Sequence, residues 1–223
     1  MSVPDQKVAT SLQPGIAAAT PCYRFAFMGP PASGKGTQAR RLAEREGLPY
    51  LSTGGILRAA IREGSPLGLQ AQPFLDRGRY LPDELMIPVI QDWLWRQEGG
   101  WVLDGFPRTE SQAKMLLQLT GGEFRAIVLA VPDDALIERA GGRWECLDCH
   151  WTSTRAEPCQ LCGGQMTRRE DDGEIKFQAR LAAFKDQVEP AISLFRESGH
   201  AVILDGGGKI EEVEGELQRV LHE

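Results

Sequence analysis

Five short apolar runs recur along the chain, and segments with a helical pattern of apolar and polar positions separate them. The runs comprise residues 23–28, 49–52, 101–104, 126–131 and 201–205. Short apolar runs are typical of strands buried on both faces, and helical connections between them favour parallel pairing. The pattern therefore predicts an α/β fold in which a five-stranded parallel sheet is flanked by helices.

The segment between the first strand and the first helix, residues 29–37, reads Gly-Pro-Pro-Ala-Ser-Gly-Lys-Gly-Thr. A strand, a turn with glycines and a helix in this order are typical of a phosphate-binding P-loop. Gly29 and Gly34 let the backbone bend so that successive N–H groups point into one anion-sized concavity. Lys35 supplies a mobile positive charge for the β- and γ-phosphate oxygens. We therefore expect a P-loop NTPase-like sheet whose ligands lie beyond the carboxyl ends of its strands.

The loop departs from the general P-loop pattern at one position. Gly36 separates Lys35 from Thr37, whereas Ser or Thr usually follows the lysine directly. A glycine-rich turn without a ligand is the alternative interpretation. The lysine, the threonine and the preceding strand together favour the phosphate site.

Composition and charge restrict the class of protein. With 42% hydrophobic and 25% charged residues among 223, the chain resembles an ordinary soluble globular protein. No apolar run approaches the roughly 20 residues that a membrane-spanning helix needs, so no membrane partner is expected. Residues 1–22 lack the basic start and apolar stretch of a secretion signal, which predicts a flexible leader on a cytoplasmic protein. The net charge of −6 argues against a nucleic-acid partner, because phosphate backbones are normally met by excess Lys and Arg.

The second strand continues into Ser-Thr-Gly-Gly-Ile-Leu-Arg at residues 52–58. Thr53 is expected to cap the helix that carries Arg58. Several short helical pieces in a small mobile lobe are predicted up to residue 83, because the chain is interrupted by Gly64, Pro66, Gly68, Pro73, Gly78 and Pro82. Arg58 is either a functional cation of this lobe or an ordinary solvated residue.

Asp104 ends the third strand. Beside a P-loop, a carboxylate at the carboxyl end of a strand is where a Mg²⁺-associated group is expected, acting through water because magnesium keeps much of its hydration shell. An aspartate at a strand end is also a common turn former, so this interpretation depends on the P-loop.

Four of the five cysteines form two C-x-x-C pairs, Cys146 with Cys149 and Cys159 with Cys162. In a chain without a secretion signal, such pairs favour a metal site over disulfides. Four thiolates suit one tetrahedral Zn²⁺ and leave no open position for catalysis, so the metal is expected to be structural. Free or disulfide-bonded cysteines, or His150 in place of one cysteine, are the alternatives.

Three motifs identify a family. They are Gly-Lys-Gly-Thr-Gln at residues 34–38, Ser-Thr-Gly with Leu-Arg at 52–58, and Asp-Gly-Phe-Pro-Arg at 104–108 with Gln112. Together they resemble the adenylate kinase family of nucleoside monophosphate kinases, and the resemblance covers nearly all of the chain from residue 23 onward. The Lys-Gly-Thr spacing is this family's own form of the P-loop. The cysteine segment resembles the zinc-bearing lid of some bacterial members.

The resemblance implies a role for each matching position. The implied catalytic residues are the cations Lys35, Arg108, Arg139, Arg143, Arg169 and Arg180. ATP is implied to contact Gly29, Gly34, Lys35, Gly36, Thr37, Arg139, Arg143 and Gly206. AMP is implied to contact Thr53, Arg58, Arg108, Gln112, Arg169 and Arg180, with Gln112 reading the base. Asp104 is implied as the magnesium-associated carboxylate, Asp171 and Asp172 as the acidic pair that steadies the lid, and Cys146, Cys149, Cys159 and Cys162 as zinc ligands.

The resemblance also implies a reaction and a division of the chain. The reaction is the reversible, Mg²⁺-dependent transfer of the terminal phosphoryl group from ATP to AMP, giving two ADP. The division is a core P-loop domain at 23–52, 82–142 and 173–223, an AMP-binding lobe at 53–81 and a zinc-binding lid at 143–172. The lobe and the lid are expected to close over the nucleotides. A monomer is expected.

Three positions depart from the family. Gly55 replaces an acidic residue that usually follows Ser-Thr-Gly, Ala32 stands where a third P-loop glycine is usual, and Trp144 follows Arg143 where a basic residue is common. None of these changes removes a phosphate ligand. They affect the tuning of nucleotide affinity more than the chemistry.

Two other functions remain open. One is a nucleoside monophosphate kinase for a different base. The other is a non-catalytic nucleotide sensor whose metal lobe binds a partner, although a pure binding module has no need of groups that stabilise transferring charge. The three histidines, His150, His200 and His222, are expected to be surface or helix-end residues without a catalytic role.

Overall fold

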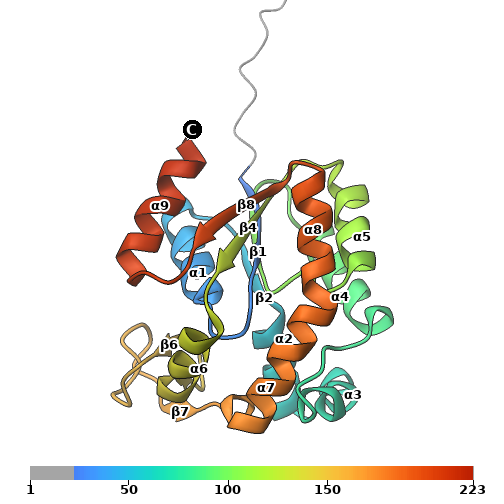
Figure 1. The fold of residues 1–223 in the computed structure, drawn as a ribbon. Coiled ribbons are helices and arrows are strands. Elements are labelled where there is room, and N and C mark those ends of the chain that lie inside the picture. Colours follow the sequence, from blue (N-terminus) through green and yellow to red (C-terminus); the bar gives the residue numbers. More distant parts are fainter. Residues whose placement is uncertain (1–22, 223) are drawn as a thin grey trace, which may run out of the picture.

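The computed structural model describes residues 23–222 (Figure 1). The leader expected at residues 1–22 lies outside the described residues. All five predicted strands are present, as β1 (Arg24–Met28), β2 (Tyr50–Ser52), β3 (Trp101–Asp104), β4 (Arg125–Ala130) and β8 (Ala201–Asp205). They form one sheet in the order β2-β3-β1-β4-β8, and every neighbouring pair is parallel. The predicted sheet is therefore confirmed.

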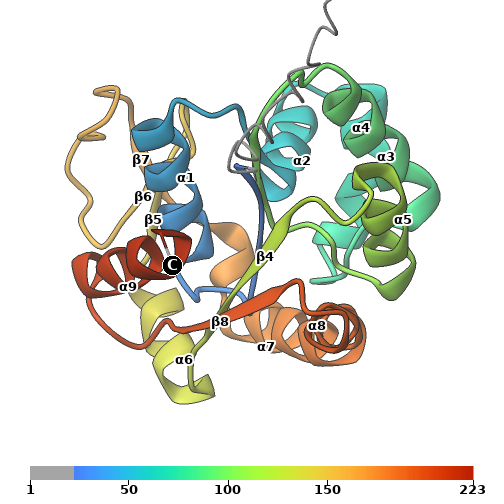
Figure 2. The same cartoon turned by 90° about the horizontal axis from the view of Figure 1, so that it is seen from above.

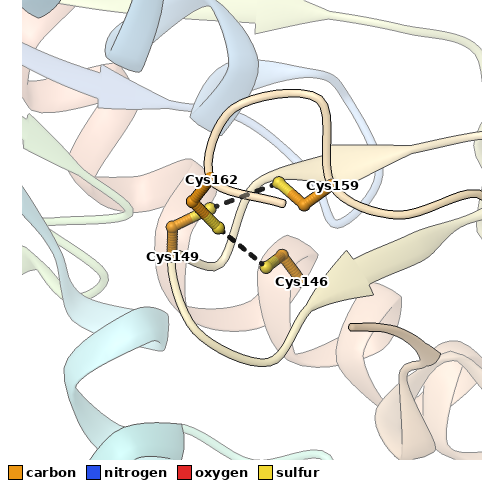
Figure 3. Close-up of side chains that lie close together, drawn as sticks. All are labelled: Cys146, Cys149, Cys159 and Cys162. Carbon is orange, nitrogen blue, oxygen red and sulfur yellow. Dashed lines mark hydrogen bonds between the residues drawn. The ribbon is translucent and has the colours of Figure 1, made fainter. Parts of the chain in front are cut away.

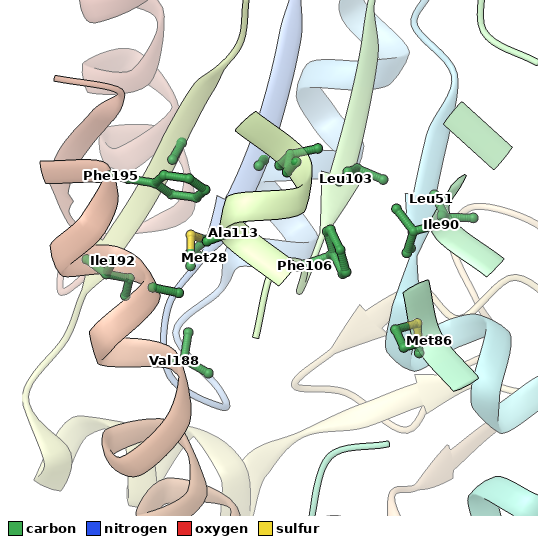
Figure 4. Close-up of a cluster of buried hydrophobic side chains, with 14 of the residues drawn as sticks. Met28, Leu51, Met86, Ile90, Leu103, Phe106, Ala113, Val188, Ile192 and Phe195 are labelled. Atoms are coloured by element: carbon green, nitrogen blue, oxygen red, sulfur yellow. The ribbon is translucent and has the colours of Figure 1, made fainter. Parts of the chain in front are cut away.

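Helices cover both faces of the sheet (Figures 1 and 2). The helices α1 (Lys35–Glu46) and α9 (Ile210–His222) lie on one face, and α4 (Asp83–Trp95), α5 (Glu110–Thr120) and α8 (Glu189–Glu197) lie on the other. The side chains of β1 alternate accordingly: Phe25 and Phe27 pack with α1 and α9, whereas Ala26 and Met28 pack with the opposite layer. Figure 4 shows that second layer, with Phe195 of α8 and Ala113 of α5 close to Met28.

Two helices occupy the chain between β2 and α4, namely α2 (Thr53–Arg62) and α3 (Pro66–Leu75). The expected interruptions are present at Gly64, Pro66, Gly78 and Pro82, which lie between helices or at their ends. They are absent at Gly68 and Pro73, because α3 runs through both. Gly68 is required for the contact between the two helices: a β-carbon there would lie 2.0 Å from the carbonyl oxygen of Ala60. The glycine lets the helices approach closely and does not end either of them.

The remaining elements follow β4. After α6 (Asp133–Gly142), three short strands, β5 (Trp144–Cys146), β6 (Thr152–Ser153) and β7 (Met166–Arg168), form a separate antiparallel sheet in the order β6-β5-β7. A 3₁₀ turn, η1 (Glu170–Asp172), leads into α7 (Glu174–Ala183), which continues through the π-helical segment η2 (Phe184–Val188) into α8. Within the described residues, no helix combines the length and apolar character needed to cross a membrane.

Candidate active site

The loop after β1 has the conformation that its glycines predict. Gly29 and Gly34 have φ angles of 144° and 89°, which glycine adopts far more readily than other residues. Ala32 also has a positive φ of 63°, at the position where the family usually has glycine. Its methyl group packs with Leu136 and Phe177, and this packing offsets the backbone cost of the departure.

The N-terminus of α1 is suited to an anion. Gly34 is its N-cap and provides no side-chain cap, and its first turn, Lys-Gly-Thr-Gln, contains no acidic residue. The unpaired N–H groups and the helix dipole therefore favour a negative ligand. Lys35 lies at this point and its ammonium donates to the carbonyl oxygen of Pro30 at 3.0 Å. Burial lowers the pKa of Lys35 to about 7, although the Asp104 carboxylate opposes this change. A phosphate beside Lys35 would restore the charged form.

Most of the expected cations line one cavity of about 350 Å³. They come from the first position of α1, from α2, from the segment after β3, from the two residues that flank the β5–β7 segment and from α7, and they are Lys35, Arg58, Arg108, Arg143, Arg169 and Arg180. Gly34, Gly36, Thr37 and Asp104 line the same cavity. Gly29 lines a smaller neighbouring pocket with Lys35 and Arg108. Elements far apart in the sequence thus bring six basic side chains to one cavity beside the P-loop and the end of β3.

Four expected nucleotide-site residues line neither this cavity nor the smaller pocket in the described structure: Gly206, Arg139, Thr53 and Gln112. The guanidinium of Arg139 donates to the carbonyl oxygens of Gly206 and Gly207 at 2.7 and 2.9 Å, so it holds the turn after β8. Gly206 is packed closely against Val131 and leaves no room for a side chain, because a β-carbon there would lie 2.7 Å from Cγ2 of Val131.

Asp171 and Asp172 bind the arginines that flank the β5–β7 segment. The Arg143 Nε donates to Asp172 Oδ2 at 2.8 Å, and Arg169 contacts both carboxylate oxygens of Asp171 at 2.9 and 2.8 Å. Arg180 contacts both aspartates at 3.0 Å. Burial alone would raise the pKa of Asp171, but Arg169 and Arg180 hold it far below its usual range. This acidic pair therefore keeps three cavity arginines in fixed positions.

Glu145 was not anticipated from the sequence, yet it connects two parts of the site. This buried carboxylate accepts from Arg58 Nε of α2 at 3.0 Å and lies 3.1 Å from Arg169 Nε. Its Oε1 is also 2.8 Å from His150 Nδ1. Burial would raise the pKa of Glu145, but His150, Arg169 and Arg58 lower it to about 2. The sequence offers no signal for these contacts, because Arg58 lies 87 positions away.

The expectation that His150 is a surface or helix-end residue is wrong. Its side chain is only 17% exposed and lies between Glu145 and Arg62, whose Nη2 is 3.2 Å from His150 Nε2. His150 also does not replace a cysteine among the candidate metal ligands, because the group found within the described residues consists of the four cysteines. His200 follows α8, where its ring stacks on Phe124 with centroids 5.4 Å apart, and His222 is the last residue of α9.

The Asp104 carboxylate lies against the start of α1. A β-carbon at position 36 would be 3.0 Å from Asp104 Oδ2, which explains why glycine separates Lys35 from Thr37. Tyr50 and Ser52 both donate to Oδ2, at 3.1 and 3.0 Å. Among the described residues, the buried Oδ1 has no hydrogen-bond partner. An unpaired buried carboxylate oxygen next to a P-loop fits a hydrated magnesium ion.

Thr53 does not cap α2, contrary to the expectation. The N-cap is Ser52, whose Oγ accepts from the N–H of Gly55 at 3.3 Å. Thr53 instead donates to the carbonyl oxygen of Gly105 at 2.9 Å and accepts from Arg108 Nη2 at 3.1 Å. Its role is therefore to hold the Asp-Gly-Phe-Pro-Arg segment.

Arg108 is positioned by the rest of that segment. Its Nε donates to the carbonyl oxygen of Gly105 at 2.6 Å, and its guanidinium lies over the Tyr80 ring at 4.5 Å. Gly105 has a φ of 74°, and a β-carbon there would be 2.8 Å from Arg108 Nη2. Glycine is thus needed both for the turn and for the close approach of the arginine.

Gln112 is buried, with 1% of its surface exposed. Its Oε1 accepts from the backbone N–H of Arg108 at 2.8 Å, and its Nε2 donates to Asp83 Oδ1 at 2.7 Å. Because a carboxylate only accepts hydrogen bonds, Asp83 determines which way the amide points. One N–H and one lone pair of the amide are left for another group.

The four paired cysteines converge as predicted (Figure 3). Their Sγ atoms all lie within 4.8 Å of one another, and two of the distances are 3.5 Å. A disulfide would require about 2.05 Å, whereas tetrahedral zinc with bonds of about 2.3 Å separates its sulfur ligands by roughly 3.8 Å. The thiols are free, and their spacing fits one metal ion.

Comparisons with known proteins agree with this site. The model of a family described as "Adenylate kinase" matches residues 27–200. The chain is similar to the adenylate kinase of Methanosarcina barkeri, with 41% identity over 208 residues that cover 87% of this chain and 96% of the relative. It is also similar to the adenylate kinases of Syntrophotalea carbinolica and Bacillus licheniformis, each 37% identical, with 89% and 87% of this chain and 96% of each relative covered.

Proposed function

The chain belongs to the adenylate kinase family and is therefore a phosphotransferase acting on nucleoside monophosphates; from this premise we propose that it transfers the terminal phosphoryl group of ATP reversibly to AMP, giving two ADP. The observation that carries the proposal is the convergence of Lys35 and five arginines on one cavity at the P-loop. Phosphoryl transfer needs mainly positioning and charge neutralisation from the protein, and this set of side chains supplies both.

The cations divide between the two nucleotides. Lys35, the N–H groups at the start of α1 and Arg143 would hold the ATP phosphates, while Arg58 and Arg108 would hold the AMP phosphate. Arg169 and Arg180 come from the β7–α7 region and would neutralise charge on the phosphoryl group in transit. Arg139 would act indirectly, by holding the turn at Gly206 that borders the ATP base.

Asp104 and Thr37 would hold the magnesium ion that accompanies ATP, with Asp104 acting through water. When bound, magnesium neutralises part of the phosphate charge and orients the β- and γ-phosphates. The unpaired Oδ1 of Asp104 supports this assignment. Cys146, Cys149, Cys159 and Cys162 would hold one structural zinc ion, because four thiolates complete a tetrahedral site.

AMP is the proposed acceptor because the matching relatives are adenylate kinases and because of Gln112, which is buried beside the cavity and does not line it in this structure. Its amide retains one donor and one acceptor, which can pair with an adenine edge. A kinase for another base would need a different group here. We further propose that residues 53–81 form the acceptor lobe and 143–172 the lid, and that both close over the nucleotides to exclude water.

The test is a coupled assay of ADP formation from ATP with AMP, CMP, UMP or GMP, in the presence and absence of Mg²⁺. AMP should be the best acceptor, and turnover should require Mg²⁺. Lys35→Met and Arg108→Ala should each lower kcat by about 10²–10³-fold, because they remove charge that stabilises the transition state. Arg196→Ala, on the exposed side of α8, is the matched control and should retain wild-type kcat. Faster turnover of CMP or UMP than of AMP would refute the proposed acceptor.

A further inference from the structure

The two oxygens of the Asp104 carboxylate have different surroundings. Oδ2 accepts from Tyr50 Oη at 3.1 Å and from Ser52 Oγ at 3.0 Å, and it faces Gly36 closely. Oδ1 is buried and has no hydrogen-bond partner within residues 23–222. All four residues line the main cavity. The hydroxyl groups thus occupy one oxygen, whereas the other is buried without a partner among the described residues.

The sheet register places both donors on the same side of β2. Ser52 is paired with Asp104 in the parallel ladder between β2 and β3, and Tyr50 lies two residues earlier. Side chains two apart on a strand point to the same face, so the two hydroxyl groups converge on one carboxylate. Ser52 is additionally the N-cap of α2, and the Tyr50 hydroxyl, which lies beside Ser52, donates to Asp104.

The Tyr50 ring is itself held in place. The Arg40 guanidinium lies 5.1 Å from the ring centroid, and its Nη2 donates to the carbonyl oxygen of Cys149 at 2.8 Å. Arg40 belongs to α1, so the ring sits between the P-loop helix and the strand that carries it. Because Arg40 restricts the position of the ring, the Tyr50 hydroxyl points toward Asp104 and has little freedom to move away from it.

We propose that Tyr50 is a positioning residue for the magnesium-associated carboxylate: it fixes Oδ2 of Asp104 so that Oδ1 faces the ligand. This rests on the proposed Mg²⁺-dependent function of the same site. Tyr50 does not touch the substrate in this role and acts only through Asp104. Removal of its hydroxyl leaves Oδ2 with the Ser52 bond alone, and the carboxylate gains freedom to turn away from the metal.

The test compares ATP affinity with excess Mg²⁺ and with excess EDTA, by calorimetry and without an acceptor, so that no turnover occurs. The ratio of the two dissociation constants measures how strongly the protein couples Mg²⁺ to ATP. In Tyr50→Phe this ratio should fall about three- to tenfold, the range expected for one hydrogen bond. The Mg²⁺ concentration for half-maximal activity should rise by a similar factor. Tyr23→Phe removes a phenol hydroxyl outside the cavity lining and should leave both values unchanged.

A double-mutant cycle with Asp104→Asn separates this role from a purely structural one. Because Tyr50 acts through the Asp104 carboxylate, Tyr50→Phe should not change the ratio further in the Asp104→Asn background. An unchanged ratio in Tyr50→Phe alone, or an equal fall in both backgrounds, would overturn the proposal. Failure of the wild-type protein to bind ATP even with excess Mg²⁺ would instead reject the proposed function. Thermal melting of each variant verifies that it is folded.

Discussion

The proposed lobe, formed by α2 and α3, and the proposed lid, formed by β5–β7, both border the cavity, but different forces hold them together. Leu57 and Ala71 of the lobe are buried in the same hydrophobic cluster as one face of the main sheet. The lid has only a small cluster of its own, built around Cys146, Cys159 and Met166. The lobe is therefore an extension of the core, whereas the lid depends on its thiols and ion pairs.

This difference follows from the size of each segment. The two helices bury apolar side chains against each other and against the sheet, which is the main source of stability in globular proteins. Three strands of two or three residues cannot bury enough surface to fold alone, so we expect the proposed metal to provide the missing free energy. Different perturbations should therefore unfold or destabilise the two segments.

Removal of the metal should have the largest effect and should act on the lid alone. Binding of zinc to small structural sites is worth about 10–16 kcal/mol, so a chelator or the double variant Cys159→Ser/Cys162→Ser should unfold residues 143–172. Hydrogen exchange should show loss of protection there and retained protection in β1, β3 and α2. Cys22→Ser, outside the two pairs, is the matched control. A metal content well below one per chain in untreated protein, with four readily titrated thiols, would contradict this expectation.

The next largest effect should come from Gly68→Val and should act on the lobe alone. Because a β-carbon at position 68 would overlap the Ala60 carbonyl at 2.0 Å, α2 and α3 must move apart. The free energy of unfolding should fall by at least about 2 kcal/mol, and the KM for AMP should rise. Gly99→Val is the control, since a side chain at the exposed Gly99 meets nothing within 4 Å. Metal content should stay at the wild-type level; its loss would show that lobe and lid are not independent.

A smaller effect is expected where the two segments meet. Glu145→Gln keeps the shape of the side chain but removes the charge that pairs with Arg58 and Arg169. Chemical denaturation should show a loss of about 1.5–3 kcal/mol, the usual value for hydrogen bonds to charged groups. Glu110→Gln breaks an exposed ion pair with Lys114 and should change stability by no more than about 1 kcal/mol. Equal effects of the two substitutions would mean that Glu145 does not join lobe and lid.

The local parts of the site could be predicted from sequence because neighbouring residues create them. Gly34, Lys35 and Thr37 form a P-loop through their spacing after a strand, and Asp104 is placed by the end of β3. The two C-x-x-C pairs bring their thiols together over a short hairpin. In each case the geometry follows from a few consecutive backbone angles and the direction of one strand.

Other contacts depend on how distant segments pack. Glu145 meets Arg58, Tyr50 meets Asp104, and Gln112 meets Asp83 across 87, 54 and 29 positions respectively. No periodicity or motif marks such pairs. The burial of His150 has the same origin, since its partners come from the lid and from α2.

The sequence by itself determined the alternation of the main-sheet strands and helices along the chain, the phosphate-binding loop and the four cysteines proposed as metal ligands, because these are consequences of local spacing and hydrophobic pattern. Only the tertiary structure decided that Ser52 and not Thr53 caps α2, that Gly36 makes room for a carboxylate, and that Arg139 holds the turn at Gly206. The physical reason is that a buried polar group takes the nearest partner that packing provides. Which partner is nearest depends on how distant segments pack in the complete fold.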